Sequence, residues 1–388
     1  MINSVCGIRS TGRICTDLAV ELERQGHEVK IAYGRENVTA EFERFAVKIG
    51  TDLDVKLHGI KARVFDAMGF GSAEATKVFI HWLKKYDPDI IHLHNIHGYY
   101  INIEILFEYL KTCGKKIIWT LHDCWAFTGH SAYCDAIDCT SWKTGCHDCP
   151  QKNVYPKSLT DNSKNNWLKK KEIFTGIPDF TIITPSNWLK GLVQKSFFKD
   201  YPVEVIHNGI DTNVFKPTES DFREKYNLQN RFALLGVATS WDEMKGLNDY
   251  ILLSKLLSED YQIVLVGLSS KKFRTLPKNI IGIQRTSNIK ELAEIYSACD
   301  VLLNLTYCDT YPTVNLEALA CGTPVVTYDT GGSPEAIGDN GIVTEKGNMR
   351  DLLIAIEKLC SEPKELISNM RLYDKVTAIK QYITIYNK

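Results

Sequence analysis

Short runs of β-branched and aliphatic residues recur along this chain, and amphipathic segments of helical period separate most of them. In the first half these runs are INSV, EVKIAYG, DIIHLHN, KKIIWTLHD, FTIITPS and VEVIHNG. In the second half they are FALLGVAT, YQIVLVG, NIIGIQRT, DVLLNLT, PVVTYD and GIVTE. Strands that alternate with helices form parallel sheets with helices on both faces, so the pattern predicts an α/β protein of two doubly wound domains.

The length of the chain is too great for one ordinary core, because single domains hold about 100–200 residues. We expect a first domain over residues 1–208, with a cysteine-rich insertion at 124–150. A second domain is predicted over 209–365. Residues 366–388 are predicted to form a C-terminal helix that packs back on the first domain.

Composition excludes several classes of protein. The chain is 44% hydrophobic and 24% charged, which is typical of soluble globular proteins. Its net charge of −1 attracts neither nucleic acid nor anionic lipid as a whole. No apolar run reaches the roughly 18–20 residues of a membrane span, and no signal peptide opens the sequence, so we expect a cytoplasmic location. The opening run MINSV is short for a first strand, which is either stubby or continued upstream.

The segment CDTYPTVNLEALACGTPVV places two carboxylates, Asp309 and Glu317, around a turn and a helix start. We expect Thr313 to cap that helix, whose first amides, those of Val314 and Asn315, would bind a phosphate. Glu317, one turn further, would accept hydrogen bonds from vicinal hydroxyls such as those of a ribose. Asp309 would point toward a polyol beyond the phosphate. Together these groups outline a site for a nucleotide sugar.

Several further segments occur in an order that resembles a known family. They are RQGHEV, LHD, ITPSNWLK, VIHNGIDTNVFKP, MKGLNDYI and the acid-x7-Glu segment before ACGTPVV. The set resembles the family-4 retaining glycosyltransferases of the GT-B type. LHDCWAFTGH, with the cysteines that follow it, is similar to capsule or colanic-acid-type polysaccharide transferases within that family. The resemblance implies two Rossmann-like domains that face each other across a cleft.

The resemblance also implies roles for individual residues on the donor side. Glu317 would bind the ribose, and Thr313 and Val314 would meet the diphosphate. Lys245 would neutralise the diphosphate, and Asp309 would bind hydroxyls of the transferred sugar. The remaining implied site residues are His122, beside the sugar, and the donor-binding Tyr311, Gly7, Gly12 and Arg13.

Three features depart from the family pattern. Asp309 stands where a glutamate is usual, which moves the carboxylate back by about one methylene. The segment GVATSWDEMKG has no arginine before its lysine, so the diphosphate would meet one cation fewer. The first loop has separated glycines, Gly7 and Gly12, in place of an adjacent pair, and either Arg9 or Arg13 could supply the missing charge.

The acceptor side is less defined. His92 and His94 alternate with apolar residues on one predicted strand, and no carboxylate or cysteine lies nearby at metal-ligand spacing. We predict a core or acceptor role, with His94 and Asn95 as the acceptor residues. The acceptor would be an oligosaccharide or a lipid-linked saccharide, and the donor a UDP-sugar in preference to a GDP-sugar. WLKKKEIF (167–174) offers a basic amphipathic patch for peripheral membrane contact, although it is also typical of a solvated helix face.

Four cysteines of the insertion follow the spacing C-x4-C-x6-C-x2-C, and they are Cys134, Cys139, Cys146 and Cys149. Four thiolates around one ion would stabilise a segment with little apolar content, which favours a structural zinc. An iron–sulfur cluster, a disulfide and free thiols remain alternatives. None of these would take part in catalysis, for which no cofactor is required.

The prediction from sequence is therefore a retaining hexosyltransferase whose catalysis does not depend on a metal. An isomerase of nucleotide sugars on the same architecture is the first alternative. It would need an acid/base pair in the cleft, and we expect no matching acid in the loops of the first domain. The second alternative is a catalytically degenerate transferase that serves as a partner subunit, which the Asp309 change and the absent arginine favour.

Overall fold

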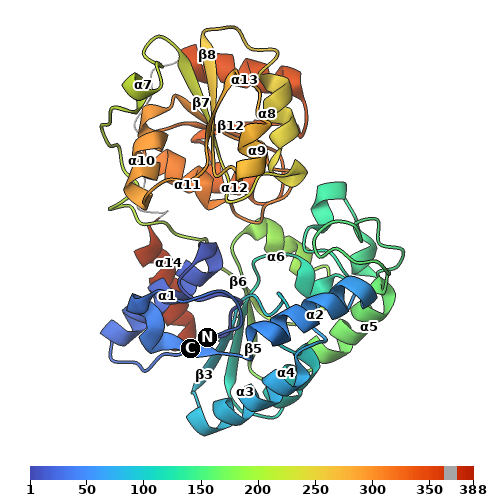
Figure 1. The fold of residues 1–388 in the computed structure, drawn as a ribbon. Coiled ribbons are helices and arrows are strands. Elements are labelled where there is room, and N and C mark those ends of the chain that lie inside the picture. The colour runs from blue at the N-terminus through green and yellow to red at the C-terminus, as the bar shows by residue number, and fades with distance from the viewer. Residues whose placement is uncertain (362–373) are drawn as a thin grey trace. The chain divides into compact units, whose positions relative to one another are not determined.

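A computed structural model describes residues 1–361 and 374–388 of the chain. These residues form two compact units, and Figure 1 colours the chain by residue number from blue at the N-terminus to red at the C-terminus. The first unit contains Met1–Ile206 and Ile379–Lys388, and the second contains His207–Ala378. The predicted boundary between residues 365 and 366 lies outside the described residues.

The first unit is built on parallel strands. They are β1 (Ile31–Tyr33), β2 (Ala46–Lys48), β3 (Ile90–Leu93), β4 (Lys116–Thr120), β5 (Phe180–Thr184) and β6 (Val203–Val205). Strands β3 to β6 pair in chain order, and β1 pairs with β2. Ile2 joins the two groups because it bridges Ala32 on one side and Leu93 on the other, both in parallel. The strand predicted over INSV is thus reduced to one bridging residue, Ile2, whereas β2 was not predicted.

Helices cover the sheet of the first unit. They are α1 (Arg9–Arg24), α2 (Asp52–Phe65), α3 (Ala73–Tyr86), α4 (Ile103–Leu110), α5 (Ser163–Phe174) and α6 (Asn187–Val193). Short 3-10 turns are η1 (Ala40–Phe45), η2 (Trp125–Phe127), η3 (Cys134–Ile137) and η4 (Ser141–Lys143). Aromatic rings fill the core between β4, α4 and α5, where Trp119 contacts both Phe107 and Phe174. Such tilted and edge-on ring pairs add to the burial of apolar area.

The second unit holds a single parallel sheet of order β12-β11-β10-β7-β8-β9. Its strands are β7 (Phe232–Val237), β8 (Tyr261–Val266), β9 (Ile280–Ile283), β10 (Val301–Asn304), β11 (Val325–Tyr328) and β12 (Gly341–Thr344). This is the doubly wound order, and its direction reverses between β7 and β10. Loops that leave these two strands diverge there, so a crevice for a ligand is expected at their carboxyl ends.

Helices cover both faces of this second sheet. They are α7 (Phe222–Lys225), α8 (Leu247–Leu253), α9 (Ser270–Arg274), α10 (Ile289–Ala298), α11 (Thr313–Ala320), α12 (Ser333–Ile337) and α13 (Met349–Ser361), with the turn η5 (Glu243–Lys245). Adjacent strand residues alternate between two cores, as period two requires: Leu235 packs in one and Leu234 in the other. The predicted strand–helix alternation therefore matches the described part of this unit.

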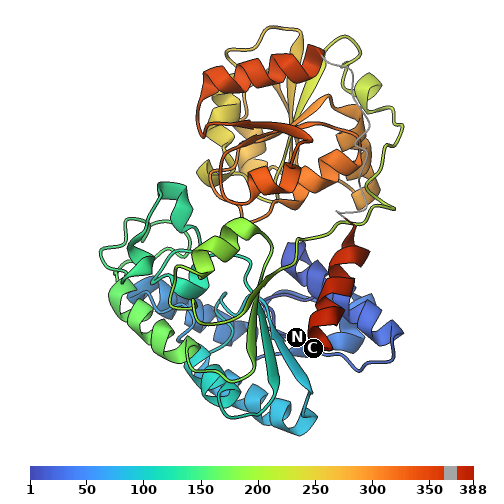
Figure 2. The ribbon, with the colours of Figure 1, turned by 180° about the vertical axis from the view of Figure 1, so that it is seen from behind.

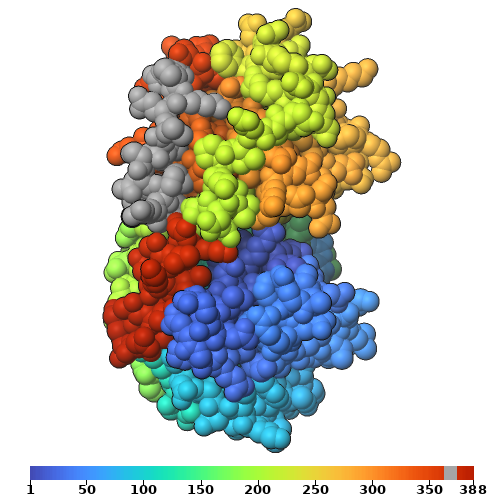
Figure 3. Space-filling view, turned by 90° about the vertical axis from the view of Figure 1, so that its left-hand side faces the viewer, coloured from blue at the N-terminus to red at the C-terminus, as the bar shows by residue number. Residues whose placement is uncertain are grey.

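The last helix, α14 (Lys375–Tyr386), returns to the first unit from Ile379 onward. Figures 2 and 3 show this C-terminal segment in red beside the blue N-terminal segments. Two tyrosines, the buried Tyr382 and the half-buried Tyr386, attach it to the sheet. The His92 Nδ1 atom lies 2.6 Å from the Tyr386 hydroxyl, and Thr120 Oγ1 donates to the Tyr382 hydroxyl at 3.3 Å.

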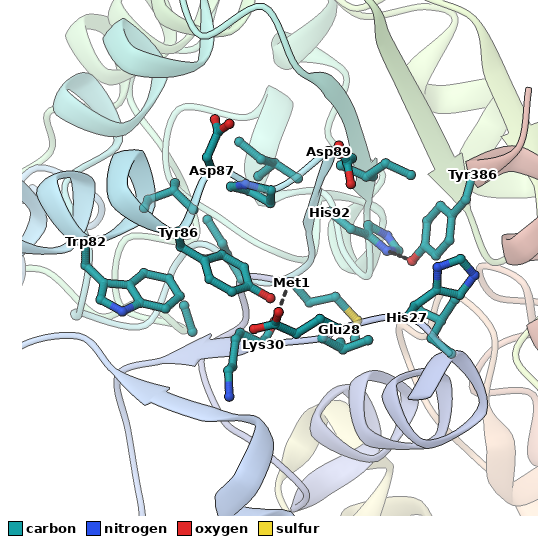
Figure 4. Close-up of a pocket in the computed structure, with 18 of the residues that line it drawn as sticks. Met1, His27, Glu28, Lys30, Trp82, Tyr86, Asp87, Asp89, His92 and Tyr386 are labelled. Atoms are coloured by element: carbon teal, nitrogen blue, oxygen red, sulfur yellow. Dashed lines mark hydrogen bonds between the residues drawn. The ribbon is translucent and has the colours of Figure 1, made fainter. Parts of the chain in front are cut away.

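A cavity of about 290 Å³ opens at the amino ends of β1 and β3. Figure 4 shows Trp82 and Tyr86 of α3 on one side of it, and His92 with Tyr386 on the other. Ligand sites of doubly wound sheets lie at the opposite, carboxyl ends of the strands. The position of this cavity therefore argues against a role in donor binding.

The segment predicted to offer a basic surface patch, residues 167–174, lies in α5 and is buried only in part, since Leu168, Lys169, Lys171 and Glu172 are exposed. Trp167, Lys170 and Phe174 are 5%, 1% and 0% exposed. The Lys170 ammonium donates to the carbonyls of Trp125 and Thr128 at 2.8 and 3.1 Å and lies 3.6 Å from the Trp125 ring centroid. Lys170 therefore belongs to no surface patch, because these loop carbonyls, remote in sequence, take up its hydrogen bonds. Lys169 and Lys171 are exposed, and membrane contact through this segment stays a prediction.

Burial lowers the pKa of Lys170 to about 7, even though Asp66 and Cys146 act in the opposite direction. Between pH 7 and 10 the unfolded chain keeps this proton and the folded chain releases it, so the folded state gains stability as pH rises. We expect the unfolding free energy of wild type minus that of Lys170→Met to rise by up to about 1.4 kcal/mol per pH unit in this range. Urea unfolding followed by tryptophan fluorescence measures it.

The matched control is Lys169→Met, because Lys169 lies on the same helix and is exposed beside Glu104. Its difference from wild type should stay constant with pH. A pH-independent difference for Lys170→Met as well would contradict the buried, proton-releasing state of Lys170.

Candidate functional site

The crevice of the second unit is formed by the loops that leave β7 and β10. Lys245 ends the turn η5 in the first of these loops, and the Asp242 side chain accepts a hydrogen bond from its amide at 3.1 Å. Gly246 follows with φ +69°, and a Cβ there would lie 2.1 Å from the Leu305 carbonyl oxygen. Only glycine permits this conformation together with this approach, which holds Lys245 against the end of β10.

Lys245 and Asp309, both predicted from sequence, meet in this crevice. The Lys245 Nζ atom lies 2.9 Å from Asp309 Oδ2, and the lysine side chain remains 38% exposed. Burial by itself lowers the pKa of Lys245, but the Asp309 carboxylate outweighs it, and the pKa is raised overall. The crevice therefore holds a fixed positive charge that solvent and solutes can reach.

The backbone of Asp309 is positioned by the loop after β11. The Gly332 amide donates to the Asp309 carbonyl at 2.9 Å, and a Cβ on Gly331 (φ +55°) would lie 1.9 Å from that oxygen. The Asp309 carboxylate also accepts a hydrogen bond from the Tyr311 amide at 3.3 Å. Two loops from different strands thus converge on one acid.

Helix α11 begins at Thr313, but Thr313 does not cap it. Pro312, with φ −70° and extended ψ, occupies the cap position and has no side-chain acceptor. The amide of Asn315 is bonded to the Pro312 carbonyl at 3.2 Å. The amides of Thr313 and Val314, in the first turn, precede any carbonyl that the helix could offer them. Of the two amides predicted to bind a phosphate, those of Val314 and Asn315, the Asn315 amide already donates within the chain. The helix start therefore offers fewer donors to a phosphate than expected.

Glu317 lies on the second turn of α11 and is held by Tyr296 of α10. The Tyr296 hydroxyl donates to Glu317 Oε2 at 2.9 Å. Burial, together with the glutamate, raises the pKa of Tyr296 well above its usual value, so the phenol stays protonated and remains a donor. This contact fixes the direction of the carboxylate before any ligand arrives.

Tyr311, predicted to bind donor, is buried in the structure. Its ring stacks on His207 with centroids 4.8 Å apart and planes 3° apart, and its carbonyl accepts from Asn208 at 3.4 Å. His207 in turn lies 2.8 Å from a carboxylate oxygen of Glu335. His207 and Glu335 were not found from the sequence, because nothing in their spacing links residues so far apart.

In the first unit, histidines line the carboxyl ends of β3 and β4. His94 Nδ1 lies 3.0 Å from His122 Nε2, and their rings stack with planes 14° apart. Burial lowers the pKa of His122 to about 4, although the Asp123 carboxylate acts in the opposite direction. Burial also lowers the pKa values of His92 and His94 well below the usual range. These imidazoles are therefore neutral at physiological pH.

His97 and Asp123 form a pair beside this group that the sequence analysis missed. His97 Nε2 lies 2.8 Å from Asp123 Oδ2, and Asp123 Oδ1 accepts from the Trp125 amide at 2.9 Å. Burial tends to raise the pKa of Asp123, but His97 outweighs it and the pKa is lowered. The loops of the first unit thus hold an acid, Asp123, while the expectation that none of their acids matches Asp309 stays a prediction. LHD, which places Asp123 at a strand end, contained the signal.

The first loop is shaped by its glycines. The Gly7 amide donates to the Gly12 carbonyl at 3.2 Å, and with φ +74° a Cβ on Gly7 would lie 2.6 Å from the Phe42 ring. Arg13 is exposed on α1, whereas Arg9 pairs with Glu36 at 2.5 Å. Of the two arginines considered for the missing charge, Arg9 is thus committed to an ion pair within the first unit.

Asn95, the second predicted acceptor residue, follows β3 directly. Its amide donates to the buried Asn3 side chain at 3.2 Å, and its carbonyl accepts from the Tyr100 hydroxyl at 2.8 Å. The backbone after β3 is therefore fixed from two directions, and it carries His94 and Asn95 at the end of the strand.

The predicted zinc ligands do not form a metal site among the residues that the structure describes, since no group of three or more His, Cys, Asp or Glu side chains there is arranged to hold an ion. Cys134 is buried and the other three are half-buried, all as free thiols. Burial raises the pKa of Cys146 to about 12 and that of Cys149 to about 11. In the described residues the four cysteines form no zinc-binding arrangement, and the zinc prediction itself stays untested.

The chain matches known families over nearly all of its length. Residues 11–214 match the family described as Glycosyltransferase Family 4, and residues 218–375 match the one described as Glycosyl transferases group 1. Among the solved structures, the fold is similar to the sucrose-phosphate synthase of Thermosynechococcus elongatus, with TM-score 0.73, 17% identity and coverage of 98% and 94% of the two chains. It is also similar to Anabaena Alr3699/HepE in complex with UDP-glucose, with TM-score 0.68, 15% identity and coverage of 100% and 98%.

Two curated relatives match over part of their length. WcaC of Escherichia coli strain K12, described as a glycosyl transferase of colanic acid biosynthesis, is 25% identical over 66% of this chain and 63% of its own. The N-acetyl-alpha-D-glucosaminyl L-malate synthase of Bacillus anthracis is 26% identical over 58% of this chain and 63% of its own. The alignments thus span somewhat less than two thirds of these relatives.

Among the described residues, no helix has both the length and the apolar content that crossing a bilayer requires. The predicted catalytic residues are divided between the units, with His122 in the first and Lys245 and Asp309 in the second. The Family 4 match covers more than half of the chain, and the two doubly wound sheets are those of the GT-B fold. The chain belongs to glycosyltransferase family 4.

Proposed function

We propose that this protein is a retaining, metal-independent glycosyltransferase that moves a hexose from a nucleoside-diphosphate sugar to a saccharide or lipid-linked acceptor. Its place would be in the biosynthesis of a surface polysaccharide such as a capsule. The observation that carries the proposal is the contact between Lys245 and Asp309 at the switch point of the second sheet, beside the first turn of α11. This arrangement puts a cation, a helix start and an acid within one crevice.

The donor would bind across these groups in order. Glu317, already oriented by Tyr296, would accept hydrogen bonds from the ribose hydroxyls. The first-turn amides of α11 and the Lys245 ammonium would stabilise the charge that grows on the departing diphosphate. Asp309 would then exchange its contact with Lys245 for hydroxyls of the sugar. Tyr311, Gly7, Gly12 and Arg13 stay in the proposed donor site through the family resemblance.

The mechanism we favour is substitution on one face of the sugar. The leaving diphosphate oxygen would take the proton of the acceptor hydroxyl, while that hydroxyl oxygen bonds to the anomeric carbon. His122 would lie beside the sugar as a neutral hydrogen-bonding group, which its lowered pKa supports. A neutral imidazole does not repel Lys245 or compete with it for the diphosphate. His94 and Asn95 would contact the acceptor.

UDP is our favoured nucleotide, since the structurally similar HepE was solved with UDP-glucose. A lipid-linked acceptor would bring the protein to the inner face of the cell membrane, where it would act from the cytoplasm. The likeness to WcaC supports an acceptor in polysaccharide synthesis.

One observation favours a second function. The His97–Asp123 pair supplies the acid and base in the first unit that a nucleotide-sugar isomerase would need. An isomerase would alter the sugar of its nucleotide-sugar with no acceptor present, whereas a transferase would not. NMR of UDP-sugars incubated with the protein alone separates the two activities. A degenerate partner subunit would convert none of them and would bind nucleotide weakly or not at all.

Lys245→Ala should weaken UDP binding by about 1.5–3 kcal/mol, the range for hydrogen bonds to charged groups. Binding of uridine, which has no phosphate, should change far less. Isothermal titration with both ligands measures the contrast, and Lys272→Ala, at an exposed lysine of α9 in the same unit, is the control. Equal losses for UDP and uridine would remove Lys245 from the diphosphate site.

Glu317→Gln should weaken binding of both UDP and uridine by about 1–3 kcal/mol, because both carry the ribose. Tyr296→Phe should reproduce part of this loss, since it removes the hydroxyl that orients the carboxylate. Glu357→Gln, at an exposed acid of α13, serves as the control. Unchanged affinity for both ligands in Glu317→Gln would show that the ribose binds elsewhere.

A further inference from the structure

Helix α2 turns an apolar stripe toward solvent. Leu53, Leu57 and Ile60 are 64%, 57% and 61% exposed, and the half-buried Val64 continues their spacing. At 3.6 residues per turn these positions fall within about 60° of the helix circumference. The opposite side of the helix is buried at His58 and Ala62. We call the stripe, together with Leu159, the α2 face.

This arrangement is the reverse of an ordinary surface helix, in which the side away from the core is polar. Single exposed apolar residues are common, but several large ones on one face mark a surface that another phase or molecule covers. A residue outside the helix, Leu159, extends the stripe. Leu159 is 63% exposed, and its amide donates to the Arg63 carbonyl at 2.8 Å, so it lies at the end of α2.

The charges on α2 identify what would cover it. Lys56 and Arg63 lie exposed on one flank of the stripe, whereas the Lys61 ammonium, on the other flank, donates to the Phe70 carbonyl at 2.7 Å. The acids of the helix are confined to its first turn and are engaged locally. Asp52 pairs with Lys48 at 2.8 Å, and Asp54 completes a capping box with the residue before the helix. Beyond that turn the helix carries only positive charge.

A second copy of the chain fits this face poorly. The helix has 14 residues and is therefore about 21 Å long, so its stripe presents an area of roughly 200 Å², well below the ~800 Å² per partner of a stable interface. Pairing two such faces would also bring the basic flanks together. An anionic bilayer meets both requirements, since it takes up leucine and isoleucine side chains and attracts lysine and arginine at its headgroups.

We propose that the α2 face rests on an anionic membrane surface, with the stripe in the headgroup region and the side chains of Lys56 and Arg63 reaching the lipid phosphates. Figure 1 shows α2 on the outside of the first unit. The inference deepens the membrane contact of the proposed function, and moves it from residues 167–174 to α2. The surface argument itself does not require that the protein transfer sugar.

The test is co-sedimentation of the full chain with vesicles of phosphatidylcholine alone or mixed with phosphatidylglycerol. Wild type should bind the anionic vesicles, less so at high salt. Leu57→Ser with Ile60→Ser should weaken that binding about tenfold or more. Lys56→Gln with Arg63→Gln should also weaken it and remove most of its salt dependence. Val78→Ser is the matched control, because Val78 is 72% exposed on α3, outside the face.

Three results would overturn the proposal: no binding of wild type to anionic vesicles, equal binding by the stripe variant and wild type, or a dimer in solution that the stripe variant abolishes. The UDP-induced rise in melting temperature is measured on the same variants. It should be unchanged, since the α2 face and the donor crevice belong to different units. Loss of vesicle binding with the UDP response intact thus separates this proposal from the proposed function.

Discussion

The donor crevice depends on one ion pair, between Lys245 and Asp309 at 2.9 Å. Both residues depend on a glycine for their positions. Gly246 and Gly331 have positive φ, and each is approached by a carbonyl oxygen that a Cβ at that position would exclude. The carboxylate raises the pKa of the lysine and keeps it charged without ligand. An incoming diphosphate would thus meet a cation already in position, at the cost of displacing one carboxylate.

The two units treat charge in opposite ways. The second holds a cation open to solvent, whereas the first buries a group of histidines whose pKa values are lowered, His122 to about 4. The charged pair there, His97 with Asp123, is satisfied internally at 2.8 Å. Such a division suits a reaction in which the negative charge develops on the nucleotide side and the acceptor side supplies hydrogen bonds without net charge.

Most of the sheet framework could be predicted from the sequence, because every strand of the second unit coincides with an apolar run that the turns delimit. Local chemistry was harder. Thr313 was expected to cap α11, but Pro312 takes the cap position. A sequence pattern locates a helix start only to within one or two residues, so it does not distinguish these two neighbours. The burial of Lys170 and the partnership of His97 with Asp123 depend on residues 26 or more positions away. Contacts of that range leave no periodic signal in the chain.

The central claim, that the second unit holds a nucleoside-diphosphate sugar, is tested most directly by thermal shift. The protein is heated with UDP, GDP, ADP, TDP and CMP, and with the sugar-bearing forms of the diphosphates. A ligand that binds only the folded state raises the melting temperature. The account predicts a rise with one diphosphate, UDP first, and a larger rise with one of its sugars. No rise with any of them would contradict it and favour a degenerate partner subunit.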